Sequence, residues 1–416
     1  MGDPSKVKPP AFQLSIQRIA YLLIILVILT YVLIVGKDFL VPVVLALFLT
    51  FMFKPICDRF ERLLRSRVAA IFITFLVALL PLLGILFFFG VQLLNIYADS
   101  QEIADGLLKG LDHMVDSITQ FAGFQKSRAD AIIADGLEQL VEQPGDLIAA
   151  SLLSSTTMLA NFFLVIIYVF FFLLYRTAFK RFLLAQMPKK SREEGSVLLY
   201  EIQQVVQDYL MGLLLVMLLL GILNSTGLYL IGIEYAFLWG FLGALLAVIP
   251  YIGTTIGGLL PFIYAVATTD DFWQPVAVVL LYGTIQALEG NIITPKIVGN
   301  KVNINPLTAI FALIIGGYIW GVAGMVIALP LIAMVRITFA HLRPLQPVAL
   351  LMSDAIYEDS DRFLSEYDKP EYRLSSFFRL VSQSALLSQL NQSPKRQPPK
   401  RIAKTDTEKI TQSEPE

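Results

Sequence analysis

Residues 237–267 read FLWGFLGALLAVIPYIGTTIGGLLPFIYAVA, and this stretch decides the fold class of the chain. A helix that crosses the hydrocarbon core of a bilayer needs about 20 apolar residues, so the stretch is longer than one straight span requires. Prolines and glycines interrupt it at Pro250, Gly253, Gly257, Gly258 and Pro261. We therefore expect a broken helix or a re-entrant hairpin at this point, inside a membrane.

A second stretch of the same kind, residues 307–335, reads LTAIFALIIGGYIWGVAGMVIALPLIAMV. Unwound main chain at membrane depth is tolerated only where it is buried in protein or lines a watery cavity, and its freed N–H and C=O groups can then bind a polar solute. Glycines can instead serve close helix packing. We expect a functional break at 250–253 and at Gly316 and Gly317, and packing roles for Gly321 and Gly324.

Other apolar segments occur along the chain, at 19–35, 39–53, 68–94, 155–174, 209–231 and 272–288. Hydrophobic residues make up 56% of the sequence and charged residues only 16%, so a soluble domain could not cover its core. The sequence predicts an all-α polytopic membrane protein with about eight transmembrane segments, two of them Gly/Pro-broken or re-entrant, and a small external helical subdomain. Residues 36–38 leave room only for a tight hairpin between the first two spans.

The distribution of charge predicts the orientation. Lysine and arginine gather at 54–67 and 176–192, whereas acidic residues dominate 95–154. Because positive loops stay inside, the first two stretches and both termini are expected in the cytoplasm and the third outside, in a multi-pass membrane protein. The predicted organisation is a cytoplasmic N-terminus (1–18), three spans (19–94), an external, periplasmic helical subdomain (95–154), a fourth span (155–175), a cytoplasmic amphipathic helix region (176–208), a transport core with broken helices (209–338) and a cytoplasmic tail (339–416), disordered from about 391.

The amphipathic stretch 196–208 has two interpretations. It either lies along the inner membrane surface before it turns into the fifth span, or extends that span as a helix into the cytoplasm.

Sequence features of an enzyme are missing. The chain has no Gly-x-x-x-x-Gly-Lys-Ser/Thr phosphate loop, so ATP hydrolysis is not expected. Its two histidines, His113 and His341, lie outside the predicted spans, and its single cysteine, Cys57, has no partner for a disulfide. We expect no catalytic residue, no metal site and no cofactor, and the net charge of −1 gives no indication of nucleic-acid binding.

The most informative polar group follows the apolar segment 272–288. Gln286, Glu289 and Asn291 occur there together, before Pro295 and Lys296. A carboxylate at membrane depth is costly unless it lines a path or is paired, so Glu289 is a functional candidate by default. The alternative is an interfacial residue that caps the helix or pairs with Lys296.

Charge also suggests how the broken stretches are oriented. Asp270 and Asp271 precede the 272–288 segment, and Lys296 and Lys301 follow it. The positive-inside bias then favours 237–267 as a hairpin that returns outside and 307–335 as one that returns inside, so that the two would meet near the midplane. Two long single spans would give the same ends.

Four motifs carry a resemblance to a known family. They are PYIG at 250–253, LEGNIITPKIVG at 288–299, NPL at 305–307, and GGYIWGVAG at 316–324, which is followed by Pro330 and Leu331. The chain resembles the autoinducer-2 exporter family, also called PerM-like permeases. The resemblance implies export of a small polar signal such as autoinducer-2 in some members, sodium/proton exchange in others, and homo-oligomers, with pentamers among them. The polar extension after His341 departs from common members.

We hypothesise that a small polar solute or a cation passes between the two broken elements. The expected pathway residues are Pro250, Gly253, Thr255, Gln286, Glu289, Asn291, Pro295, Gly316 and Gly317. One rival is a cation/proton antiporter in which Glu289 titrates. A second is a membrane scaffold or receptor that transports nothing and binds partners through the external subdomain.

Overall fold

The computed structural model describes residues 16–372 except 102, 104, 108, 111–143, 250, 251, 270, 300 and 301. Most of the external subdomain predicted at 95–154, and the tail from 373, lie outside the described residues. The longer helices are α1 (Ile16–Val35), α2 (Lys37–Leu64), α3 (Arg67–Ala98), α6 (Pro144–Ala185), α7 (Arg192–Ile231), α8 (Ala236–Leu246), α9 (Ile252–Thr268), α10 (Trp273–Leu288) and α12 (Pro306–His341). The short helices α13 (Gln346–Met352) and α14 (Arg362–Ser365) follow.

The described part of the chain is helical and contains no strand. Six of its helical stretches are long and apolar enough to cross a membrane, and three shorter apolar helices accompany them. Many of the side chains on these helices are large, apolar and exposed, as lipid-facing residues are. The prediction of an all-α polytopic membrane protein is therefore confirmed.

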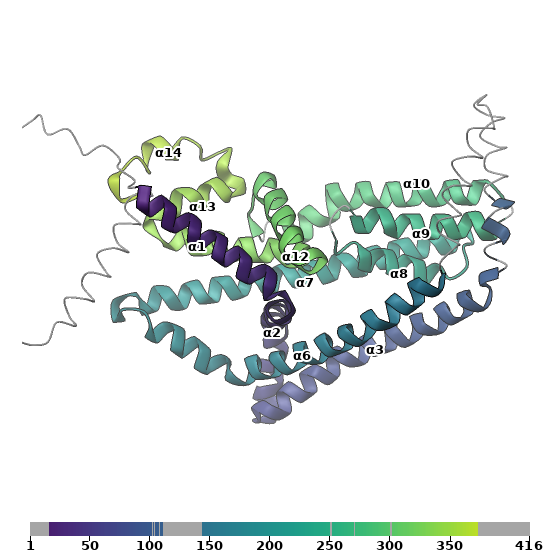
Figure 1. The fold of residues 1–416 in the computed structure, drawn as a ribbon, viewed down its shortest axis with the longest axis horizontal. Coiled ribbons are helices and arrows are strands. Elements are labelled where there is room, and N and C mark those ends of the chain that lie inside the picture. The colour runs from purple at the N-terminus through teal and green to yellow at the C-terminus, as the bar shows by residue number, and fades with distance from the viewer. Residues whose placement is uncertain are drawn as a thin grey trace, which may run out of the picture.

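Two of the helices are much longer than a bilayer is thick. With 42 residues in α6 and 40 in α7, each extends about 60 Å, against a hydrocarbon core of about 30 Å. α7 runs along the long axis of the molecule, α6 bends midway along its length, and a turn joins the two helices at one end (Figure 1). Because α7 is continuous from Arg192, the interpretation of 196–208 as a helical extension of the fifth span is the correct one.

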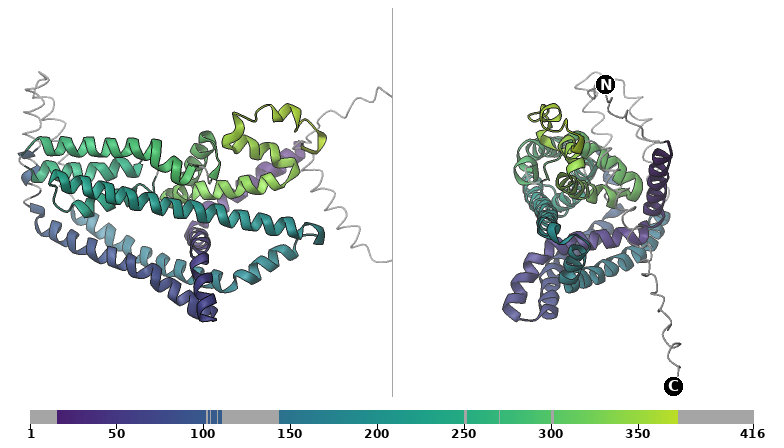
Figure 2. Two further views of the ribbon diagram at one scale, coloured as in Figure 1. Left: turned by 180° about the vertical axis from the view of Figure 1, so that it is seen from behind. Right: turned by 90° about the vertical axis from the view of Figure 1, so that its left-hand side faces the viewer.

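The connection between α1 and α2 differs from the tight hairpin predicted at 36–38. Helical hydrogen bonds continue through Gly36, whose N–H donates to the carbonyl of Val32 at 2.8 Å and whose carbonyl accepts from Leu40 at 2.8 Å. The chain bends at this residue instead of reversing. In consequence α2 crosses the direction in which α3, α6 and α7 extend (Figures 1 and 2).

A buried cluster fixes α2 in this crossing position. Its members come from α2, α3 and α6, and are Ala46, Cys57, Ala70, Ile71, Val169 and Leu173. At the edge of the cluster the Arg176 guanidinium donates to Asp58 at 2.6 Å and also to Glu61. Apolar packing and ion pairs thus join α2, α3 and α6 into one unit.

The first broken stretch forms a helical hairpin, α8–α9. Gly243 and Gly257 face each other so closely that a Cβ on Gly257 would lie 2.7 Å from the Gly243 Cα. At the turn, a Cβ on Gly253 would collide with the carbonyl of Leu246. Small residues therefore allow the two arms to touch, as membrane helices often do.

The second broken stretch, α12, is also folded back on itself. At Gly321 the main chain adopts φ 62° and ψ −139°, a conformation reserved for glycine. On either side of it Gly316 and Gly324 are in contact, since a Cβ on Gly316 would lie 2.5 Å from the Gly324 carbonyl oxygen. Two residues eight apart in a straight helix would be about 12 Å apart, so the chain reverses at Gly321.

Both hairpins pack against α7, at different levels. The α8 arm lies against its C-terminal half, where a Cβ on Gly221 would lie 2.7 Å from the Phe241 ring. The α12 arms lie against its N-terminal half, where Val206 packs on Ile327 and Tyr209 packs on Ala333. Through these contacts α7 connects the two hairpins.

Candidate functional site

The candidate site lies where α10 ends and the helix widens. Residues Glu289–Ile293 and Pro295–Gly299 form two π-helical turns, a rare geometry that is frequent at functional sites. Pro295 has no N–H, so the carbonyl of Asn291 loses its regular helical donor. Wider turns accommodate this loss while the chain continues in the same direction.

Neutral donors hold the Glu289 carboxylate. Gln286 donates its side-chain amide to one carboxylate oxygen at 2.9 Å, and the Thr294 hydroxyl donates to the other. The Asn291 amide donates to the carbonyl of Ala287 at 2.8 Å. Among the described residues Glu289 forms no ion pair with Lys296, so the alternative of a Glu289–Lys296 pair is wrong.

This segment lies beside the tip of the first hairpin. Ile293 and Ile297 pack against Val216 and Leu220 of α7, in the same cluster as Ala247 at the end of α8. Three of the predicted polar residues, Gln286, Glu289 and Asn291, are therefore near the α8–α9 turn. Gln286 and Asn291 are exposed, and Glu289 is half-buried.

The other predicted pathway residues are distributed over both hairpins. Gly253 is buried at the α8–α9 turn and Thr255 is exposed on the first turn of α9, whereas Pro250 lies outside the described residues. Gly316 and Gly317 belong to the α12 hairpin, where Gly317 packs against Met325.

The break predicted at Gly316 and Gly317 is found elsewhere. Both residues are helical, and Gly316 serves close packing, whereas the main chain breaks at Gly321, to which we had assigned a packing role. Gly324 does pack, as expected. Glycine identity revealed the hairpin, but it did not reveal which glycine carries the positive φ.

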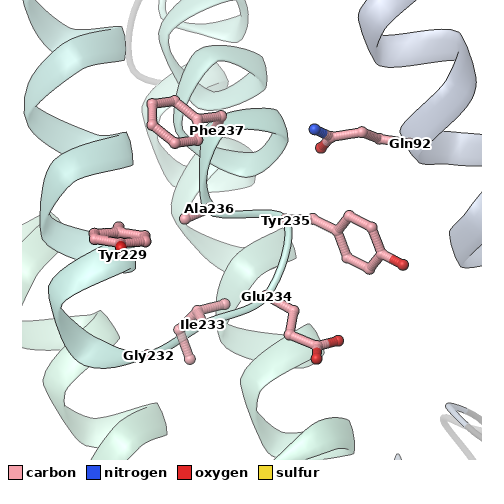
Figure 3. Close-up of a pocket in the computed structure, with 8 residues that line it drawn as sticks. All are labelled: Gln92, Tyr229, Gly232, Ile233, Glu234, Tyr235, Ala236 and Phe237. Carbon is pink, nitrogen blue, oxygen red and sulfur yellow. The ribbon is translucent and has the colours of Figure 1, made fainter.

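Sequence reasoning missed a cavity at the opposite end of α10. It has a volume of about 400 Å³ and is lined by Gln92, Tyr229, Gly232, Ile233, Glu234, Tyr235, Ala236 and Phe237. Figure 3 shows the Gln92 side chain extending from α3 towards the connection between α7 and α8. Glu234 lies in the connection between α7 and α8, and nothing in the sequence brings Gln92 next to it.

Long apolar helices, two broken hairpins on α7 and a carboxylate near the first hairpin define a polytopic membrane protein of the transporter class. Comparison with known proteins identifies the family. Residues 23–344 match the family described as AI-2E family transporter. The chain therefore belongs to this family of membrane transporters.

Individual relatives agree with the family. The AI-2 transport protein TqsA of Escherichia coli (strain K12) is 25% identical over 351 residues, which cover 83% of this chain and 98% of TqsA. YrrI of Bacillus subtilis (strain 168), provisionally described as a transport protein, is 32% identical over 154 residues, or 37% of this chain and 43% of YrrI. PerM of Escherichia coli (strain K12), provisionally described as a permease, is 30% identical over 141 residues, or 33% of this chain and 38% of PerM. The matches to YrrI and PerM thus span less than half of those relatives.

Proposed function

We propose that this transporter exports a small polar molecule of the autoinducer-2 type across the bacterial inner membrane, with both termini in the cytoplasm, and that it does so as a homo-oligomer. One observation carries the proposal. The segment that begins at Glu289, whose carboxylate is held by neutral donors, packs through Ile293 and Ile297 against the same stretch of α7 as Ala247 at the end of α8. The nearly full-length similarity to TqsA, whose name assigns it AI-2 transport, supports the choice of solute.

The proposed path uses Glu289, Gln286 and Thr294 as exchangeable ligands. A hydroxyl-bearing solute would donate to the carboxylate in place of Gln286 or Thr294, so that it leaves water without losing hydrogen bonds. Such exchange keeps binding weak enough for release on the other side. In this mechanism the hairpins change position, and Gly321 supplies the backbone freedom for α12.

Flux measurements test the role of the carboxylate. We expect Glu289→Gln to lower the flux of autoinducer-2 in proteoliposomes about tenfold or more, because an uncharged amide binds the solute hydroxyls more weakly. The matched control is Glu193→Gln, which removes an exposed carboxylate at the start of α7. Unchanged flux in a folded Glu289→Gln protein would show that the solute does not use this group.

A sodium/proton antiporter is the second candidate, and the position of Glu289 in an apolar helix favours it. A carboxylate at membrane depth is a common carrier of protons and cations. An antiporter would acidify or alkalinise the lumen of sodium-loaded vesicles, and Glu289→Gln would abolish that change. If the internal pH of the vesicles follows the sodium gradient, the export proposal is wrong and the protein is an antiporter.

A further inference from the structure

The cavity beside α3 is separate from the Glu289 site and has its own chemistry. Most of its lining comes from residues 232–235, which connect α7 to α8, and from Ala236 and Phe237 at the start of α8, and Gln92 supplies the opposite wall. Glu234 is the one carboxylate among the lining residues, and Tyr229, Tyr235 and Phe237 are the aromatic ones.

The connection that presents these groups is held in place. Gly232 has φ 91°, and Tyr235 has φ 53°, which is rare for a residue with a side chain. Hydrogen bonds fix the start of the turn: the Gln274 side chain donates to the carbonyl of Ile231 at 3.2 Å, and the N–H of Ile233 donates to the carbonyl of Leu228 at 3.0 Å. A strained turn that its surroundings hold in place is typical of ligand-binding segments.

Negative charge accumulates here without a cationic partner. The Tyr264 hydroxyl donates to Glu234 at 3.3 Å, and none of the ion pairs among the described residues includes this carboxylate. Burial raises the pKa of the Tyr235 phenol, and the charges of Asp99 and Glu234 raise it further. The same field attracts a positively charged ligand into the cavity.

The side-chain oxygen of Gln92 is a hydrogen-bond acceptor that receives no donor. This oxygen is buried and lacks a hydrogen-bond partner. Buried polar atoms in native proteins are nearly always satisfied, so this oxygen indicates a missing N–H or O–H donor. Figure 3 shows the amide directed into the space that separates α3 from the α7–α8 connection.

We propose that this cavity binds a small organic ammonium ion, with the charge on Glu234, an N–H donated to Gln92 and the alkyl part against the aromatic rings. Aromatic faces attract organic cations, and one carboxylate balances one ammonium charge. A hard metal ion such as Ca²⁺ would require six or more oxygen ligands, which a lining with a single carboxylate does not offer. The proposal does not depend on which solute crosses the membrane.

Calorimetric titration of the full chain in detergent tests the proposal, with butylammonium as the probe and 1-butanol as its uncharged counterpart. We expect butylammonium to bind and 1-butanol to show no binding at the same concentration. Glu234→Gln should weaken butylammonium binding at least tenfold, and Gln92→Leu should weaken it several-fold. Glu193→Gln, a change at an exposed carboxylate of α7, should leave binding unchanged.

Thermal unfolding of each variant distinguishes lost binding from lost folding. We expect Glu234→Gln to remain folded, because the glutamine retains an oxygen that can accept the hydrogen bond from Tyr264. Equal binding of butylammonium and 1-butanol would overturn the proposal. So would a Glu234→Gln protein that unfolds at the original temperature and still binds the probe with the original affinity, or sodium chloride that displaces butylammonium at equal concentration.

Discussion

At the scale of single residues, the conformation of Gly321 determines the shape of α12. Its φ and ψ place the main chain where a Cβ is strongly disfavoured, while the space around it is open. The strain of a substitution would therefore come from the backbone alone. Gly283 in α10 is equally open but helical, which makes it a matched position for comparison.

We expect Gly321→Ala to destabilise the protein by about 1–3 kcal/mol and to lower the flux, because a Cβ opposes the reversal of α12. Gly283→Ala should be neutral or stabilising by up to about 1 kcal/mol, since alanine favours a helix. Thermal unfolding in detergent measures both. Equal melting temperatures for the two variants would mean that the chain does not reverse at Gly321.

Residue type alone pointed to Gln286, Glu289 and Asn291, because polar groups at the end of an apolar run are costly without a purpose. What the sequence did not reveal was the partner of Glu289. Thr294 donates to the carboxylate across the widened turns around Pro295, whereas the sequence offered Lys296 as one alternative partner.

At the scale of helices, the crossing of α2 over α6 depends on charge as well as packing. Arg176 is 14% exposed and pairs with Asp58 and Glu61, and its guanidinium also donates to the Cys57 thiol at 3.4 Å. Arg67 joins this network by donating to Glu61 at 3.1 Å. The two carboxylates are partly exposed, so screening by water weakens each pair.

Arg176→Ala should destabilise the protein by about 1–2 kcal/mol, between the values for exposed and buried ion pairs. The loss follows because Asp58 and Glu61 would repel each other without the cation. Arg181→Ala on the same helix removes an exposed arginine and should change the melting temperature little. A similar small change for both variants would exclude a role for the ion pairs in positioning α2.

The helices were the easiest part of the structure to predict, because a long apolar segment that crosses a membrane must satisfy its backbone hydrogen bonds internally, as a helix does. Both hairpins were predictable from their glycines and prolines. The bend at Gly36 was not, since a short polar link looks the same in sequence whether the chain bends or reverses. The full lengths of α6 and α7 were also missed, because the ends of these helices are amphipathic and hydropathy marks only their apolar centres.

At the scale of the whole molecule, the arrangement of both ends of α12 can be tested in cells. Asn305, just before α12, accepts a hydrogen bond from Thr308 and donates to the carbonyl of Leu351, which follows α12. The segments before and after α12 are therefore adjacent, as a re-entrant hairpin requires. A single long span would place them on opposite sides of the membrane.

Labelling with a membrane-impermeant maleimide distinguishes these arrangements in a Cys57→Ser background with one new cysteine at a time. Lys190→Cys, Lys296→Cys and Arg343→Cys should react only in inverted vesicles, and Asp271→Cys only in intact cells. All four positions are exposed. Reaction of Arg343→Cys in intact cells would mean that α12 crosses the membrane once.

The cavity beside Gln92 shows what only the folded molecule could reveal. Its walls come from α3 and from the α7–α8 connection, which are far apart in the sequence, and no local pattern links them.

The length of α7 has a mechanical consequence. About half of its 60 Å must project beyond the hydrocarbon core, together with α6, as a stiff lever. Rocking the pair by about 5° around the bilayer centre would displace the far turn by about 4 Å. Both hairpins pack against α7. A molecule that binds the turn between α6 and α7 from the aqueous side could therefore transmit force to the groups around Glu289.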